Sequence, residues 1–534
     1  MLKFKYLLLI LASFVMYQVF LFSYINSTRL TNNITIDFKY VVVHLDLKGA
    51  PPKLNYLETL LPFFKKYGVN GILIEYEDMF PYEGNLVNLS SKYRYDRKEL
   101  KKFLTQAVTQ DIEIIPLVQT FGHMEHVLKL EEYQYLREIK DYPDSICPNK
   151  PESIILIRNM LQQVINFHAS IAPLKYIHIG CDEVYHMNDC DLCHGKKLKN
   201  LEIFTNHVLV IKDVVNGLCP EATVLIWDDM IRKATDTFRS ISPYWTMKTI
   251  EALHKVQPVY WDYNPYSGSV SHLNLHIYHR SFDNIWISTA FKGADGRRAV
   301  LPVYRNRILN HFNWMAMITS FQDVRLPNFE GIIITGWSRY SHMDPLCELL
   351  PPSLSSLLLS LLIIKKFQTG VSKRDTYLLP SDFFDQYISE EFVRQTKCDT
   401  KIDYMNVNEA IDYCAIDSTY LVILLRQYTI IETSMNAFFI NDDWDVSSYE
   451  YYSKIKHLNR NNINSSMEWG KRTLKDIISW EENMQGALSN YYEKFVIDEY
   501  VGYKIYPMKI KIIKLLKTLY NYKQIPTWER RSKL

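Results

Sequence analysis

The chain has 534 residues, with 61 basic and 59 acidic side chains and a formal net charge of +2. This balance excludes a nucleic-acid-binding protein that acts through a broad basic field, and it also excludes an acidic tail. Hydrophobic residues make up 47% of the chain, charged residues 22%, and there are only 17 glycines and 21 prolines. Collagen-like, low-complexity and largely disordered chains are therefore excluded as well.

The first predicted element is an apolar helix within residues 1–30. Lys3 and Lys5 precede an apolar run at residues 6–25, and about 20 helical residues span about 30 Å, the thickness of a bilayer core. The run is long for a signal peptide, and no small-x-small cleavage site follows it. We expect an uncleaved transmembrane signal anchor with its short end in the cytoplasm. A cleaved signal peptide and a buried core helix are the alternatives.

The anchor predicts a single-pass membrane protein of the secretory pathway, in the Golgi, a lysosome-related organelle or the cell surface. The rest of the chain would then be lumenal or extracellular. The eight cysteines are an even number, which fits an oxidising compartment. N-glycosylation sequons, which only permit the modification, stand at Asn26, Asn33, Asn88 and Asn464.

Cys190 and Cys193 have the Cys-x-x-Cys spacing that is typical of zinc ligands. No second pair at zinc-finger spacing follows them along the chain. A loop disulfide, or two free thiols, is therefore the preferred interpretation.

Eight short apolar runs follow, with amphipathic helical segments between them. Such near-continuous apolar runs are typical of strands that are covered on both faces. Alternating strands and helices predict a parallel sheet, and eight such units are the number in a (β/α)8 TIM barrel. A doubly wound open sheet is the alternative, but no Gly-rich phosphate loop follows the first run. The predicted strands are residues 40–47, 71–77, 112–119, 176–182, 223–229, 257–263, 284–291 and 331–337.

The barrel is predicted to span residues 38–370. Residues 371–534 carry helical apolar spacing with no further series of strands, so we expect a helical C-terminal region packed on the barrel. The predicted strands mostly end in polar or aromatic residues, and active sites of TIM barrels lie at that end. These strand-end residues are Asp46, Glu77, Gln119, Asp182, Asp228, Asp262 and Trp337.

The sharpest local feature is the adjacent pair Asp182 and Glu183 at the end of the fourth predicted strand. Neighbouring side chains on a strand face opposite ways, so both reach one pocket only where the strand breaks into its loop. Two carboxylates in an enclosed site push their pKa values apart, which leaves one protonated to act as an acid. An aspartate cap with a glutamate ion pair at a helix start is the structural alternative.

Several motifs lie in one order along residues 40–355. They are HLDLKGAPP at residues 44–52, FPYEG at 80–84, IEIIPLVQTFGH at 112–123, IHIGCDEVY at 177–185, LIWDDM at 225–230, FKGA at 291–294 and TGWSRYSH at 335–342. With these motifs the chain resembles glycoside hydrolase family 20, the β-N-acetylhexosaminidases, and most closely the hexosaminidase D branch. The resemblance does not cover the C-terminal region.

The resemblance implies exo-acting hydrolysis of terminal β-linked N-acetylglucosamine or N-acetylgalactosamine on a glycan or glycoconjugate. In this substrate-assisted, retaining chemistry the 2-acetamido oxygen of the sugar attacks its own anomeric carbon. No metal, no organic cofactor and no nucleic-acid partner are implied. The oligomeric state is left open, a homodimer included.

By the same resemblance, Asp182 orients and polarises the acetamido N–H, while Glu183 protonates the leaving oxygen and later activates water. His123 matches the family histidine that contacts the acid glutamate, with an acidic partner at Glu77 or Asp78. An ordinary loop histidine is the alternative interpretation of His123.

The remaining candidates would line the sugar pocket. An apolar sugar face stacks on an aromatic ring, and a methyl group needs a small apolar pocket. Trp227 and Trp337 would wall the sugar and its acetamido methyl, although a strand-end tryptophan is more often part of the core. The weaker candidates for the pocket are Asp228, Trp261 and Tyr263.

The chain departs from the larger lysosomal members of the family at three strand ends. Residues 47–49 (LKG) stand where those members carry an arginine, and residues 337–339 (WSR) replace a Trp-x-Glu motif. In those members the stretch that matches residues 290–292 (AFK) contains a tyrosine that binds the acetamido carbonyl. Tyr263 is predicted to take this role in the present chain. The preference between the gluco and galacto epimers stays open. Two other functions stay open too: a glycan-binding barrel without turnover, and a barrel glycosidase acting on another sugar.

Overall fold

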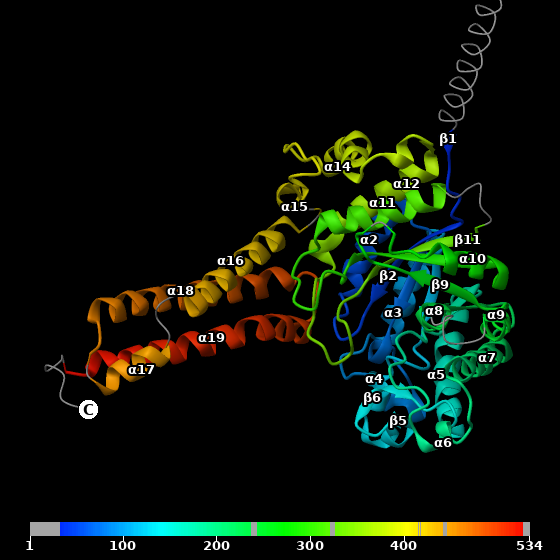
Figure 1. Cartoon of the computed structure of the whole chain (residues 1–534), viewed down its shortest axis with the longest axis horizontal. Helices are drawn as coiled ribbons and strands as arrows, with labels where there is room; N and C mark the ends of the chain where they lie inside the picture. The colour runs from blue at the N-terminus through cyan, green and yellow to red at the C-terminus, as the bar shows by residue number, and fades with distance from the viewer. Residues whose placement is uncertain are drawn as a thin grey trace, which may run out of the picture.

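The computed structural model describes residues 33–236, 243–266, 268–320, 326–414, 416, 418–441, 446–455 and 457–526 (Figure 1). The predicted signal anchor at residues 1–30 lies outside these residues, as does the sequon at Asn26. No helix within the described ranges is both long and apolar enough to span a bilayer.

Eight parallel strands close into a barrel in the order β10-β11-β2-β3-β4-β7-β8-β9. The predicted TIM barrel is therefore confirmed, and each strand begins and ends within a few residues of its predicted range. Apolar runs form these strands because helices cover the outside of the barrel and side chains fill its inside. The strands are β2 (Tyr40–Asp46), β3 (Gly71–Glu75), β4 (Glu113–Leu117), β7 (Tyr176–His178), β8 (Thr223–Trp227), β9 (Gln257–Trp261), β10 (Asn284–Lys292) and β11 (Asn328–Gly336).

The helices between the strands bury one apolar face each against the barrel. In α3 (Arg97–Thr109) the buried positions are Leu100, Phe103, Leu104 and Ala107, which repeat at the spacing of one helix face. Asp96 begins this helix by accepting hydrogen bonds from two backbone N–H groups, at 2.8 and 3.1 Å. The other main helices of the barrel are α2 (Leu54–Lys66), α5 (Pro151–Ala169), α7 (Asn200–Leu218), α8 (Asp229–Asp236), α9 (Pro243–Glu251), α10 (His272–Ser281), α11 (Tyr304–Ser320) and α12 (Leu354–Thr369).

A small insertion lies between β4 and α5. It contains the short helix α4 (Glu125–Leu128) and an antiparallel hairpin of β5 (Arg137–Ile139) and β6 (Tyr142–Ile146). The backbone N–H of Ile146 donates to the carbonyl of Phe121 at 3.1 Å, which ties the hairpin to the loop that leaves β4. The loop after β7 leads to another short helix, α6 (Asp191–His194).

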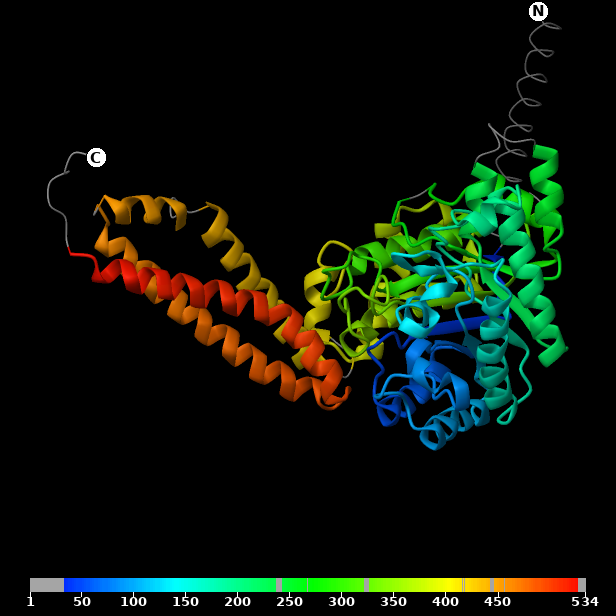
Figure 2. The same cartoon turned by 90° about the horizontal axis from the view of Figure 1, so that it is seen from below.

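The C-terminal region is helical, as predicted, apart from the two-residue strand β12 (Val371–Ser372), which pairs with β1 (Asn33–Ile34). Its first part, α13 (Pro380–Phe383), α14 (Ser389–Thr396) and α15 (Val407–Ala410), lies on the barrel (Figure 1). The remaining helices form an arm that projects from the barrel instead of lying along it (Figure 2). The arm consists of α16 (Thr419–Asn441), α17 (Val446–Lys454), α18 (Arg460–Leu488) and α19 (Lys494–Gln524).

The near end of the arm reaches the loops at the mouth of the barrel. The rings of Phe495 and Tyr93 stack with their centroids 4.1 Å apart. A guanidinium nitrogen of Arg339, just after β11, lies 2.9 Å from a carboxylate oxygen of Glu499. The helical region therefore contributes side chains next to the barrel mouth.

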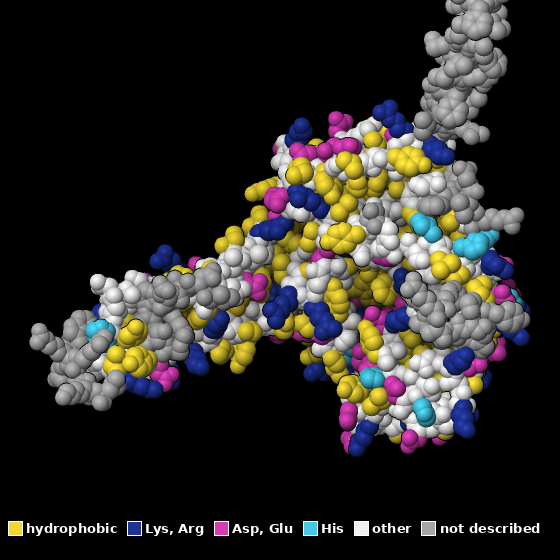
Figure 3. Space-filling view, viewed as in Figure 1, with side chains coloured by type: hydrophobic (Ala, Val, Ile, Leu, Met, Phe, Trp, Pro, Cys, Tyr) yellow, Lys and Arg dark blue, Asp and Glu magenta, His cyan; other side chains and the backbone are white. Residues whose placement is uncertain are grey.

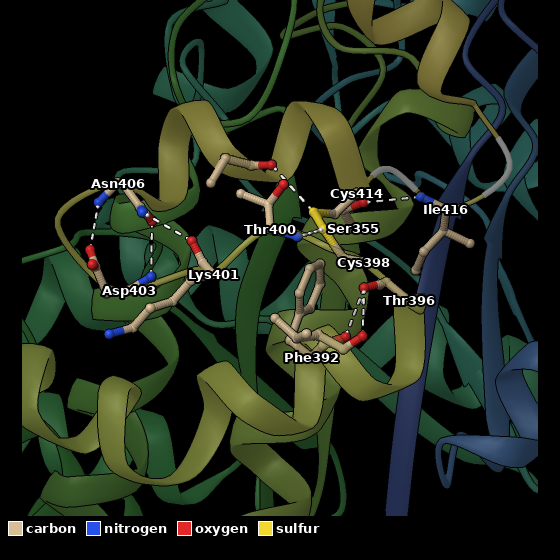
Figure 4. Close-up of a disulfide and its surroundings, with 12 residues drawn as sticks. Ser355, Phe392, Thr396, Cys398, Thr400, Lys401, Asp403, Asn406, Cys414 and Ile416 are labelled. Atoms are coloured by element: carbon tan, nitrogen blue, oxygen red, sulfur yellow. Dashed lines mark hydrogen bonds between the residues drawn. A yellow bond between two sulfur atoms is a disulfide. The ribbon is translucent and has the colours of Figure 1, made fainter.

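One disulfide, Cys398–Cys414, holds the segment between α14 and η7 (Ile411–Cys414) (Figure 4). Ile416, just beyond it, donates its backbone N–H to Ser355 of α12 at 3.3 Å. The other six cysteines are free thiols: Cys147, Cys181, Cys190, Cys193, Cys219 and Cys347.

Basic and acidic side chains are scattered over the face in Figure 3, in keeping with the near-neutral net charge.

Candidate active site

A cavity of 510 Å³ lies at the C-terminal ends of the barrel strands, the end that carries the active site in TIM barrels. Loops that follow β2, β4, β7, β9, β10 and β11 supply most of its lining. Seven of the eight predicted site residues line it: His123, Asp182, Glu183, Trp227, Trp261, Tyr263 and Trp337.

The loops that carry His123 and the two acids lie directly against each other. A β carbon at Gly122 would stand 2.2 Å from the carbonyl oxygen of Asp182, so this contact requires glycine. His123 and Glu183 both have left-handed backbone conformations, with φ of 52° and 45°. Such conformations are strained for these residue types and are concentrated at functional sites.

One imidazole nitrogen contacts both acids. Nε2 of His123 lies 3.4 Å from Oδ2 of Asp182 and 3.3 Å from Oε2 of Glu183. Gln119 donates its side-chain N–H to Oδ1 of Asp182 at 3.1 Å. The Asp182 side chain is 9% exposed and that of Glu183 is 33% exposed. Asp182 therefore lies deeper in the cavity, while Glu183 faces its opening.

The surroundings of the two acids move their pKa values in opposite directions. Burial raises the pKa of Asp182 to about 7, an effect that His123 only partly offsets. Burial also acts to raise the pKa of Glu183, but hydrogen bonds with His123 and Tyr185 outweigh it and leave this pKa below its ordinary value. For His123, burial opposes the charged form, yet the charge of Asp182 and the hydrogen bond with Glu183 raise the pKa to about 10.

Asp228, the eighth predicted residue, does not line the cavity, and this part of the prediction is wrong. Its carboxylate is fully buried and accepts a hydrogen bond from the hydroxyl of Tyr278 at 2.9 Å. Its other oxygen lies 3.3 Å from a guanidinium nitrogen of Arg232. Asp228 therefore belongs to the wall between β8 and α10.

The next residue, Asp229, does not line the cavity either, but it bonds to two residues that do, and it was not predicted. Its Oδ2 accepts a hydrogen bond from the backbone N–H of Glu183 at 3.1 Å. Its Oδ1 accepts one from the indole N–H of Trp261 at 3.4 Å. From the sequence, either Asp228 or Asp229 could have been the site residue at the end of this strand. Only the direction that the chain takes after β8 distinguishes them.

Aromatic rings form the walls of the cavity. The rings of Trp227 and Trp337 lie 5.8 Å apart at 52°, and those of Trp261 and Tyr263 stack at 5.3 Å. Trp227 is almost fully buried at the bottom, and within the described part of the chain its indole N–H has no hydrogen-bond partner. The predicted aromatic residues therefore enclose one hollow beside the acid pair.

Glu77 and Asp78, the predicted acidic partners of His123, pair with another histidine. Nδ1 of His342 lies 2.6 Å from a carboxylate oxygen of Glu77. Nε2 of the same ring lies 3.9 Å from Asp78. Within the described contacts, the acids next to His123 are Asp182 and Glu183 themselves.

Three basic residues that line the cavity were not predicted as site residues: Arg232 of α8, and Lys48 and Arg339 in loops. Lys48, after β2, lies 2.9 Å from Glu75 and holds its ammonium 4.9 Å from the centroid of the Trp337 ring. Arg339, after β11, donates to the carbonyl of Lys48 at 2.8 Å. Lys48 and Arg339 stand where the sequence departs from the larger family members. A basic residue at a strand end was the signal that could have identified them.

The chain matches one protein family and several known proteins. The family model "Glycosyl hydrolase family 20, catalytic domain" matches residues 77–259. The chain is 39% identical over 352 residues to hexosaminidase D of Homo sapiens, covering 64% of this chain and 69% of that protein. It is also 39% identical over 328 residues to hexosaminidase D of Bos taurus, covering 59% of this chain and 89% of that protein.

Solved structures that this chain matches include hexosaminidases from bacteria. The Streptomyces plicatus N-acetyl-β-hexosaminidase in complex with Thio-NAglucal is 13% identical, with a TM-score of 0.44 over 67% of this chain and 68% of that chain. The exo-β-N-acetylglucosaminidase of Vibrio harveyi in complex with N-acetylglucosamine is 16% identical, with a TM-score of 0.42 over 65% of this chain and 56% of that chain.

Proposed function

The chain belongs to glycoside hydrolase family 20, and on this premise we propose that it is an exo-β-N-acetylhexosaminidase. Its substrates are glycans or glycoconjugates that end in β-linked N-acetylglucosamine or N-acetylgalactosamine. The observation that carries the proposal is the meeting of Asp182, Glu183 and His123 in one aromatic-walled cavity. The region matched by the family model contains all three residues.

The different depths of the two acids match the two tasks of substrate-assisted hydrolysis. The sugar enters the hollow between the aromatic rings, with its acetamido group toward the enclosed end. Asp182, the deeper acid, accepts the acetamido N–H and so turns the carbonyl oxygen toward the anomeric carbon. Glu183 faces the opening, where the leaving group extends, and protonates the glycosidic oxygen. No carboxylate of the protein is needed as a nucleophile.

In the free protein the proton is favoured on Asp182, whereas the reaction needs it on Glu183. The opposite pKa shifts favour the proton on Asp182 and a charged Glu183. Both acids contact Nε2 of His123, and the charge of Glu183 contributes to the raised pKa of Asp182, so the two acids titrate as a linked pair that shares the proton. A substrate N–H that donates to Asp182 requires a carboxylate there, which favours the proton on Glu183. His123 contacts both acids and can carry the proton between them.

The side chains around the acids supply recognition of the sugar. Trp227 and Trp337 present apolar surface to the sugar face and the acetamido methyl. Tyr263 places a phenol in the same cavity, where it would donate to the acetamido carbonyl. Lys48 and Arg339 offer N–H donors to ring hydroxyls in place of the arginine and glutamate of the larger family members.

Turnover of nitrophenyl β-glycosides of N-acetylglucosamine and N-acetylgalactosamine tests the proposal. Wild-type protein should release nitrophenol, and Glu183→Gln and Asp182→Asn should lose most of the rate. Equal, negligible release by wild type and variants would instead favour the glycan-binding barrel. An N-acetylglucosamine thiazoline, which imitates the oxazolinium ion, should inhibit a substrate-assisted enzyme. Turnover without inhibition would favour a glycosidase of another type.

We further propose that the catalytic barrel is lumenal or extracellular and is held at a membrane by residues 1–30. The bilayer-length apolar run at residues 6–25 and the Cys398–Cys414 disulfide support this proposal. The sequon residues Asn33, Asn88 and Asn464 are exposed and accessible to glycosylation. Carbonate extraction of membranes and a mobility shift on removal of N-glycans test it. Light scattering of the purified protein tests a homodimer.

A further inference from the structure

Three cysteines and one glutamate meet beside the barrel mouth, outside the cavity described above. Sγ of Cys147 lies 3.5 Å from Sγ of Cys190 and 3.5 Å from Sγ of Cys193. Oε2 of Glu138 lies 3.3 Å from the sulfurs of Cys190 and Cys193. All four ligand atoms lie within 4.8 Å of one another.

We propose that Glu138, Cys147, Cys190 and Cys193 bind one structural zinc ion. Tetrahedral zinc with bonds of about 2.3 Å to sulfur and about 2.0 Å to oxygen places its ligand atoms about 3.8 Å (S···S) and about 3.5 Å (S···O) apart. The observed separations of 3.5 Å between sulfurs and 3.3 Å between sulfur and oxygen are within a few tenths of an ångström of these values. Three thiolates and one carboxylate complete a closed shell of four ligands.

The surrounding hydrogen bonds orient these ligands for a metal. Oε1 of Glu138 accepts the backbone N–H groups of Asp189 and Cys190 at 2.9 and 3.0 Å, which leaves Oε2 directed at the sulfurs. The sulfur of Cys190 accepts the backbone N–H of Cys193 at 3.4 Å. The sulfur of Cys193 accepts the side-chain N–H of Asn149 at 3.1 Å. Such outer hydrogen bonds fix the ligands and stabilise thiolate charge.

A disulfide explains the cluster less well than a metal does. A bond between any two of the cysteines leaves a third thiol and a carboxylate in the same place. Cys147 and Cys193 are fully buried and Glu138 is 4% exposed, so these groups would remain almost without water. Zinc uses all four groups at once, and the closed shell points to a structural ion rather than a catalytic one.

The ion would join the two loops that carry the catalytic groups. Glu138 lies in β5 and Cys147 directly follows β6, in the segment that continues the loop that holds His123. Cys190 and Cys193 end the loop that holds Glu183. The backbone N–H of His186, in that second loop, also donates to Ser145 of β6 at 3.4 Å. Zinc at this position would therefore fix the positions of His123 and Glu183 relative to each other.

Metal analysis of the purified full-length protein tests the site directly. Inductively coupled plasma mass spectrometry should find about one zinc ion per chain in wild type. Cys193→Ser and Cys147→Ser should lower the zinc content about tenfold or more, and Glu138→Gln should weaken zinc retention during dialysis against a chelator. Cys219→Ser is the matched control, because Cys219 is a free thiol outside the cluster, and this variant should keep its zinc.

Two measurements on wild type do not depend on how the variants fold. Reconstitution with Co²⁺ should give the visible bands of a tetrahedral thiolate site. Alkylation of native protein should spare Cys190, which is only partly buried, until a chelator is added. Zinc-free wild type, zinc retained in folded Cys193→Ser, or a native disulfide among the three cysteines would each overturn the proposal. These readouts do not require activity, so they stand apart from the assay of hydrolysis.

Discussion

The carboxylate of Asp229 accepts the backbone N–H of Glu183 at 3.1 Å. The same side chain accepts the indole N–H of Trp261, so one residue links the acid to an aromatic wall of the cavity. Glu183 has a left-handed backbone conformation, which is strained and needs support from its surroundings. Asp229 supplies part of that support without lining the cavity itself.

We therefore expect Asp229→Ala to lower kcat about 10- to 100-fold, because a small displacement of the acid is sufficient for such a loss. Asp228→Ala is the matched comparison, since Asp228 bonds Tyr278 and Arg232 in the wall. It should reduce the free energy of unfolding by about 1–3 kcal/mol, with a smaller effect on kcat. Steady-state kinetics and urea unfolding of both variants measure the difference. The same kinetic loss in both would contradict this division of roles.

The acid role of Glu183 predicts a dependence on the leaving group. Removing a general acid costs about 10²- to 10⁴-fold when the leaving oxygen needs a proton. Glu183→Gln should therefore lose much less rate on a dinitrophenyl glycoside than on an alkyl glycoside. Asp182→Asn, which acts on the acetamido group, should lose a similar factor on both substrates. If the losses for Glu183→Gln did not depend on the leaving group, this assignment of roles would fail.

The pH profile follows from the proton that the two acids share. Burial raises the pKa of Asp182 to about 7, so the pair holds its proton below that pH and releases it above. The singly protonated pair is the reactive form, so kcat/KM should fall as the pH rises through about 7. Rate measurements between mildly acidic and alkaline pH check this expectation. The residual activity of Glu183→Gln should lack the alkaline decline, whereas a wild-type rate undiminished above neutral pH would contradict the assignment.

The ion pair of Lys48 and Glu75 predicts a large effect on stability. Both side chains are buried, and the nitrogen of Lys48 lies 2.9 Å from the carboxylate of Glu75. Lys48→Met should reduce the free energy of unfolding by about 3–5 kcal/mol, because it leaves a buried charge without its cation. The double variant with Glu75→Gln should recover much of this loss. Chemical unfolding of all three proteins tests it, and no recovery would show that packing, not charge, is responsible.

The sequence predicted the barrel because a strand covered on both faces is a local apolar run. All eight runs became barrel strands, and residues such as Trp227 and Trp337 reached the cavity because they stand at strand ends. The meeting of Lys48 and Arg339 was beyond sequence analysis, because 291 positions separate them and only closure of the barrel joins β11 to β2.

The pairing of adjacent acids was determined by the sequence alone, since Asp182 and Glu183 are neighbours at the point where β7 ends. The choice between Asp228 and Asp229 was decided only in three dimensions, because it depends on how the chain turns after β8. The same holds for the cysteines: Cys190 and Cys193 were visible as a pair. Glu138 and Cys147 join them only because the loops after β4 and β7 leave neighbouring parallel strands at the same end of the barrel.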